Sequence, residues 1–268
     1  MNYKHLLFKD KRATRDYMRD KRAGTLNGRQ WKDYQAQYEA FGQGFNDKSL
    51  PEGFDRELSN RYGVPVEGRP PGEYMARADK VINGVKDVLS DFGLESSLTS
   101  IYFGNSIENR RGDDGDAAMN GFGRLAISTN ALVRGDNGSR AGYFASDTLR
   151  GLGTHEAGHA VARALSDKLM KNESNLARSA AWRLGKLESA VMKEAARRYG
   201  GNYRISPYGS TSAIEKVAEA VSDVYSNGSK ANPYSHTVVG VLKDINRGKF
   251  SPKIKVTDSQ IKRLTGFR

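Results

Sequence analysis

The pentapeptide His155-Glu156-Ala157-Gly158-His159 constrains the fold of this chain more than any other stretch of its sequence. Residues four apart lie on one face of an α-helix, so His155 and His159 can direct their imidazole rings at one point. Glu156 lies one step further round the helix, beside that point. The apolar residues here recur at helical spacing, which predicts a helix through the pentapeptide: Ala157, Val161, Ala164, Leu165 and Leu169.

Two imidazoles on one helix face, with a carboxylate beside them, suit one metal ion and one water molecule. The pattern HExxH on a helix is typical of zinc peptidases, in which the glutamate is the general base. The sequence therefore predicts His155 and His159 as metal ligands and Glu156 as the catalytic base. It also predicts Zn²⁺ as the cofactor and a peptide or protein as the substrate.

Three glycines interrupt the same predicted helix: Gly151, Gly153 and Gly158. Each weakens an isolated helix by about 0.8–1.0 kcal/mol relative to alanine. We therefore expect packing against neighbouring elements to hold this helix in place. Its start is predicted at Ser146 or Asp147, because either side chain can cap a helix.

Two histidines do not complete a zinc site, so a third protein ligand is needed. The extended histidine motif of the metzincins requires Gly and His where this chain has Ala162 and Leu165, which excludes that class. His236 is a candidate ligand. It stands beside a predicted helix start, however, where an exposed or capping role is more common.

Better candidates lie on a helix predicted from about residue 213 to 225. Glu215 and Glu219 are four apart on one stripe of this helix. One can bind the metal ion while the other accepts the free ring N–H of a ligand histidine. Ser212 and Glu215 also match a capping box, which alone would account for Glu215. Spacing does not separate Glu215 supported by Glu219 from Glu219 supported by Asp223.

At this point the chain resembles a known family. The pentapeptide is followed by Tyr208-Gly209, by Glu215 seven residues beyond the tyrosine, and by Ala218-Glu219-Ala220. This order is similar to that of gluzincins of the anthrax lethal factor type. The same signature occurs in metallopeptidase-like domains of phage minor head proteins. The resemblance covers about residues 98–227.

The resemblance implies Glu215 as the third metal ligand, Glu219 as the support of His155, and Tyr208 as a hydrogen-bond donor to the oxyanion. It also implies a phage-encoded, head-associated metallopeptidase in the virion or the bacterial host cytoplasm, with head or portal proteins as partners. The alternative is a structural or portal-associated virion protein with a catalytically silent zincin fold, because a fold does not establish activity.

The chain departs from the family pattern at three positions. Ser212 stands where the family usually has Asn, and Lys216 and Val217 stand where it has bulky aromatic residues. These departures fall on the segment that carries the likeness.

The expected fold class is α+β. We expect a zincin-like lobe over residues 73–228, in which a small mixed sheet packs on the HExxH helix and the C-terminal part is helical. Strands are predicted at 98–103 and 124–128, with a Gly/Asp/Asn-rich loop between them. The second is expected to be the edge with which an extended substrate pairs, through Leu125, Ala126 and Ile127. Residues 174–199 are predicted as one long amphipathic helix.

The segments outside this lobe differ in composition. Residues 1–72 are predicted as a charged helical segment followed by a Gly/Pro-rich linker, and 229–268 as a basic tail with short helices. Residues 1–22 hold eight basic and three acidic residues, and 229–268 hold nine and two, which accounts for the net charge of +12. Such ends can contact nucleic acid, although a solvated helix face is an equal interpretation of residues 9–22.

Three classes of protein are disfavoured by the sequence. The chain has no cysteine, which excludes disulfides and thiolate metal sites. No apolar run approaches the roughly 20 residues of a membrane span, so no membrane contact is expected. The N-terminus lacks the apolar core of a Sec signal peptide.

Overall fold

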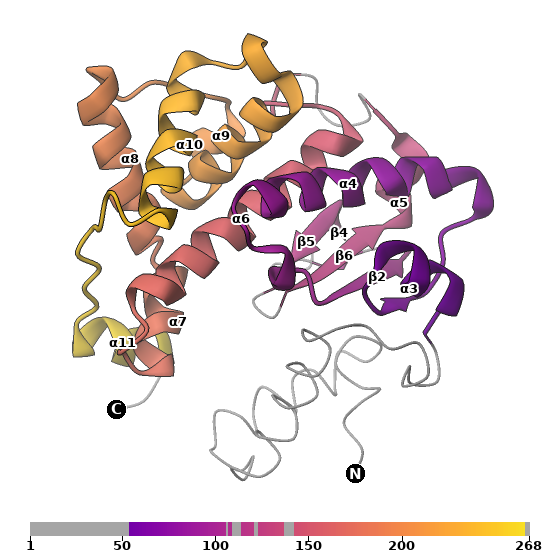
Figure 1. Ribbon diagram of the computed structural model, residues 1–268, viewed down its shortest axis with the longest axis horizontal. Coiled ribbons are helices and arrows are strands. Elements are labelled where there is room, and N and C mark those ends of the chain that lie inside the picture. Colours follow the sequence, from indigo (N-terminus) through magenta and orange to yellow (C-terminus); the bar gives the residue numbers. More distant parts are fainter. Residues whose placement is uncertain (1–53, 106, 109–113, 121–122, 137–141, 266–268) are drawn as a thin grey trace, which may run out of the picture.

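The computed structural model describes residues 54–265 except 106, 109–113, 121–122 and 137–141. Its α-helices, in chain order, are α3 (Arg56–Tyr62), α4 (Met75–Asp91), α5 (Thr129–Arg134), α6 (Leu149–Leu169), α7 (Asn175–Arg183), α8 (Lys186–Tyr199), α9 (Ala213–Asn227), α10 (Pro233–Asn246) and α11 (Asp258–Thr265). The short 3₁₀ turns are η3 (Gly72–Tyr74), η4 (Glu95–Ser97), η5 (Tyr208–Ser210) and η6 (Gly228–Lys230). The long helix α6 runs between the sheet with α4 on one side and α8, α9 and α10 on the other (Figure 1).

The main sheet has four strands in the order β1-β2-β6-β5. Its strands are β1 (Val66–Glu67), β2 (Ser100–Gly104), β5 (Ala117–Met119) and β6 (Arg124–Ser128), and a separate pair is formed by β3 (Ile107–Glu108) and β4 (Asp114–Gly115). β1, β2 and β6 are parallel, whereas β5 is antiparallel to β6. Alternate residues of β2 and β6 are buried, as period-2 side-chain alternation requires. The fold is α+β with a small mixed sheet, as expected.

The strand predicted as the substrate edge is an interior strand. β6 lies where the sequence places it, but it pairs with β2 on one side and with β5 on the other. Leu125 and Ile127 are fully buried. Both edges of β6 are therefore used within the sheet, and the prediction that a substrate pairs with Leu125, Ala126 and Ile127 is wrong. The terminal strand on this side of the sheet is β5.

The sheet begins before residue 72. β1 pairs with β2, and Leu58, Tyr62 and Val66 are buried in the same core as α4 and α6. Residues 54–72 thus contribute a helix and a strand to the domain that was expected to begin at residue 73. The charged helical segment expected at the start of residues 1–72 falls before residue 54, outside the described residues.

Helix α6 approaches its neighbours through glycines. A Cβ atom added to Gly153 would lie 2.0 Å from the carbonyl oxygen of Val81 on α4, and one added to Gly84 would lie 2.6 Å from that of Arg150. These distances exclude any side chain, so close backbone packing offsets the low helix propensity of glycine. The helix starts one residue later than expected, with Thr148 as its cap.

The C-terminal half contains two departures from the expected pattern. Residues 174–199 form α7 and α8 rather than one helix, because Gly185 takes a left-handed conformation with φ of 57°. A Cβ there would lie 2.8 Å from Cγ1 of Ile214. The segment from residue 229, expected as a tail, begins with α10, whose Tyr234, Val238 and Leu242 are buried in the core.

Within the described part of the chain, no helix combines the length and the apolar character that a membrane crossing requires.

Candidate metal centre

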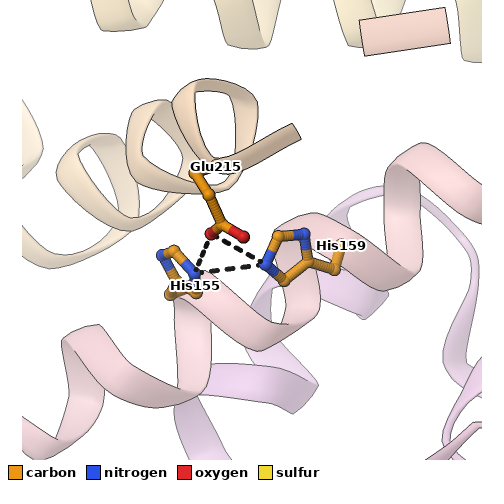
Figure 2. A group of neighbouring side chains, drawn as sticks. All are labelled: His155, His159 and Glu215. Carbon is orange, nitrogen blue, oxygen red and sulfur yellow. Dashed lines mark hydrogen bonds and ion pairs between the residues drawn. The ribbon is translucent and has the colours of Figure 1, made fainter. Parts of the chain in front are cut away.

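Three side chains that can bind a metal ion meet between α6 and α9. His155 and His159 extend from α6, and Glu215 reaches them from the first turn of α9 (Figure 2). Nε2 of His155 lies 3.2 Å from Nε2 of His159 and 3.2 Å from Oε2 of Glu215. Nε2 of His159 lies 3.4 Å from the same carboxylate oxygen. One nitrogen or oxygen from each residue therefore borders a single point.

The start of α9 directs Glu215 into this group. Ser212 caps the helix by accepting the backbone N–H of Glu215 at 3.1 Å. This bond is the serine half of the predicted capping box. The carboxylate of Glu215, which would form the other half, faces the histidines instead.

Glu219 lies behind His155 rather than beside the ligand atoms. Its Oε1 is 2.7 Å from Nδ1 of His155, and the side chain is 1% exposed. Asp223 has a different role, since its carboxylate accepts hydrogen bonds from the Asn232 backbone and the Ser235 hydroxyl and so ties α9 to α10. Of the two arrangements left open by spacing, the structure has Glu215 at the histidine pair and Glu219 as its support.

His155 and the two glutamates around it shift one another's proton affinity. Burial alone would lower the pKa of His155, but the ion pair with Glu215 and the hydrogen bond with Glu219 raise that pKa to about 10. Burial alone would raise the pKa of Glu215, but its ion pairs with His155 and His159 hold the pKa of this carboxyl well below the usual range. A metal ion bound here would replace the proton on His155, because metal ligands bind in their deprotonated forms.

Glu156, next to His155 on α6, contacts the sheet. Its side chain is buried, and Oε2 accepts the backbone N–H of Met119 on β5 at 2.8 Å. The carboxylate expected to act as a base is thus held by the terminal strand of the sheet. The bond between Glu156 and Met119 places β5 beside the site. The sequence does not predict a strand at the residues of β5.

Tyr208 lies beside His155, in η5. Its ring centroid is 5.7 Å from that of His155 and 4.9 Å from that of Phe144. Burial and the nearby carboxylates of Glu215 and Glu156 raise the pKa of Tyr208 above its ordinary value. Its hydroxyl therefore keeps its proton at neutral pH and can donate a hydrogen bond.

The remaining candidate ligand is not part of this group. His236 lies on α10, where its Nε2 is 3.2 Å from the carbonyl oxygen of Gly228.

Two other residues at the site, Ser206 and Ala145, are not predicted from the sequence. Both donate hydrogen bonds to Glu219 from irregular segments that carry no periodic signal.

Comparisons of the chain with family models, with curated proteins and with solved structures gave no significant match.

Proposed function

We propose that this protein is a zinc-dependent metallopeptidase. The observation that carries the proposal is the spacing of the three potential ligand atoms, 3.2, 3.2 and 3.4 Å. Tetrahedral zinc with bonds of about 2.0–2.1 Å has ligand atoms about 3.3 Å apart. Two imidazoles and one carboxylate also suit zinc better than calcium or magnesium, which prefer oxygen ligands.

The number of ligands favours a catalytic role for the metal. Structural zinc sites use four protein ligands, whereas catalytic sites use three and leave one position for water or substrate. Among the described residues, one histidine-containing group of potential ligands occurs, and it has three members. When bound, zinc supplies a water molecule of lowered pKa and polarises the scissile carbonyl.

The residues around the ligands have separate roles in the proposed reaction. Glu156 takes a proton from the attacking water and passes it to the leaving amine, which is general base and then general acid catalysis. Tyr208, protonated at neutral pH, donates to the oxyanion that forms at the substrate carbonyl. Glu219 accepts the Nδ1–H of His155 and so fixes the tautomer in which Nε2 carries the free lone pair.

The substrate edge belongs to β5 in this proposal. β5 is the terminal strand of the sheet, and its Met119 bonds directly to Glu156. An extended peptide that adds to the edge of a sheet forms main-chain hydrogen bonds with the terminal strand. The substrate is therefore a polypeptide segment in extended conformation that pairs along β5, the strand that contacts Glu156.

The setting of the activity is proposed from the resemblance alone. The Tyr208, Glu215 and Ala218-Glu219-Ala220 segment resembles that of metallopeptidase-like domains in phage minor head proteins. Head or portal proteins are accordingly the proposed partners and substrates, in the virion or the bacterial host cytoplasm. The basic C-terminal residues can contact nucleic acid.

One experiment tests the proposal directly. The protein is purified without added metal, its zinc content is measured by elemental analysis, and cleavage of a peptide library is followed with and without a chelator. We expect close to one zinc per chain and cleavage that stops on chelation and returns with zinc. A zinc-loaded protein that cleaves neither the library nor co-expressed head proteins would favour the structural virion protein instead.

A further inference from the structure

A buried serine connects the two sides of the candidate site. Ser206, 3% exposed, precedes η5 in the chain. Its hydroxyl donates to Oε2 of Glu219 at 2.6 Å and accepts the backbone N–H of Gly209 at 2.9 Å. An ionised carboxylate can only accept, so the hydroxyl proton must point at Glu219 and the lone pair is left for Gly209.

The packing around Gly209 makes this connection rigid. A Cβ atom on Gly209 would lie 3.2 Å from the hydroxyl oxygen of Ser206 and 3.3 Å from Cβ of Glu219. The backbone of η5 is therefore pressed against both residues. Tyr208, next to Gly209, takes its position from the same turn.

A second segment meets the same carboxylate. The backbone N–H of Ala145 donates to Oε2 of Glu219 at 2.6 Å, so this oxygen has two donors. Tyr208 is tied to that segment as well, since its N–H donates to the carbonyl oxygen of Tyr143 at 3.1 Å and its ring packs against Phe144. Glu219 is thus held on one side by these segments and on the other by His155.

We propose that Ser206 is a positioning residue that fixes His155 through Glu219 and Tyr208 through Gly209. Without the hydroxyl, Oε2 of Glu219 loses one of its two donors, and the buried N–H of Gly209 loses its acceptor. The imidazole of His155 and the phenol of Tyr208 are then held less firmly in position, although Ser206 contacts neither side chain directly. The part of this inference that concerns Tyr208 rests on the proposed peptidase function, whereas the part that concerns His155 rests only on metal binding.

The test compares Ser206→Ala with Ser210→Ala in the full chain. Ser210 is a matched control because it is exposed, lies in the same turn, and bonds to the carbonyl oxygen of Ser206 rather than to Glu219. The measurements are the zinc dissociation constant by chelator competition, the thermal midpoint, and kcat and KM at saturating zinc. For Ser206→Ala we expect zinc binding weaker by about tenfold, at the lower end of effects around metal ligands. We also expect kcat to fall with KM unchanged, and Ser210→Ala to match the wild type.

Two outcomes would overturn the proposal. One is a wild-type zinc dissociation constant in Ser206→Ala, and the other is an equal loss in both variants. If the wild type binds zinc but cleaves nothing, the peptidase function fails, and the zinc measurement still decides the role of Ser206. Should Ser206→Ala not fold, Ser206→Cys retains a side chain of similar size with a weaker donor, and its zinc affinity should again fall below that of Ser210→Ala.

Discussion

Gly158 of α6 and Ala218 of α9 meet where the two helices cross, with the Cβ position of Gly158 only 2.9 Å from Cα of Ala218. The crossing determines the site, because each of these small residues lies between two functional ones. His155 and His159 flank Gly158, and Glu215 and Glu219 flank Ala218 in the same way. A larger residue at the crossing would separate the helices that supply the ligands.

We therefore predict that Gly158→Ala destabilises the protein by about 1–3 kcal/mol through overpacking, although alanine is the better helix former. Gly240→Ala is the matched control, since Gly240 lies within α10 and a Cβ there would meet nothing within 4 Å. That change should stabilise by about 0.5–1 kcal/mol. Urea unfolding of both variants measures the difference, and equal effects would contradict the role of the crossing.

Much of this arrangement follows from local sequence patterns. The spacing of His155 and His159 places both on one helix face wherever α6 lies, and Glu215 with Glu219 form a similar pair on α9. The glycines of α6 likewise predict close packing. What the spacing leaves open is which carboxylate reaches the histidines, because that depends on where the two helices cross.

The errors concern long-range pairing and short elements. β5 has only three residues within a Gly/Asp/Asn-rich stretch, too few for a period-2 pattern, so the sequence predicts the edge at the neighbouring strand β6. The apolar stripe continues through α7 into α8, so it does not predict the break at Gly185, whose left-handed conformation leaves no mark in the periodicity. Ser206 carries no pattern at all, since its role arises from tertiary hydrogen bonds.

The third-ligand assignment predicts a graded loss of zinc. Glu215→Ala removes the carboxylate of the three-membered group formed with His155 and His159, so it should abolish tight zinc binding. Glu219→Ala keeps all three ligand atoms but frees the ring of His155, and it should weaken binding by about 10–100-fold. Chelator competition measures both. Asp223→Asn serves as a control that alters the α9–α10 contact without touching the ligands. Loss of zinc on changing Glu219 but not Glu215 would reverse the assignment.

The raised pKa of His155 predicts how zinc binding depends on pH. With its pKa raised to about 10 by Glu215 and Glu219, His155 is expected to hold a proton at neutral pH in chelated protein. Zinc must displace this proton, so its affinity should rise by about tenfold per pH unit below that pKa. Calorimetry in buffers of different ionisation enthalpy counts the protons released, and no release at pH 8 would contradict the assigned protonation.

The same shift predicts how the stability of the metal-free protein varies with pH. The folded pKa of about 10 exceeds the ordinary value of 6.5. The resulting stabilisation is fully present below pH 6.5 and is lost as the pH rises towards 10. Urea unfolding of chelated protein between pH 6.5 and 9.5 should show this decline, and His155→Gln should show a smaller one.

The last prediction concerns the base. Glu156→Gln removes the ionisable group but retains a side-chain oxygen for the N–H of Met119, so the contact with β5 can persist. Zinc content and thermal midpoint should stay close to those of the wild type, while peptide hydrolysis falls by about 10²–10⁴-fold, the contribution typical of a general base. Tyr208→Phe should have a milder effect, a loss of about 10²–10³ in kcat, because it removes one oxyanion donor and keeps the ring contacts with Phe144 and His155. Hydrolysis that survives Glu156→Gln at the wild-type rate would assign the activity to a contaminant or to another site.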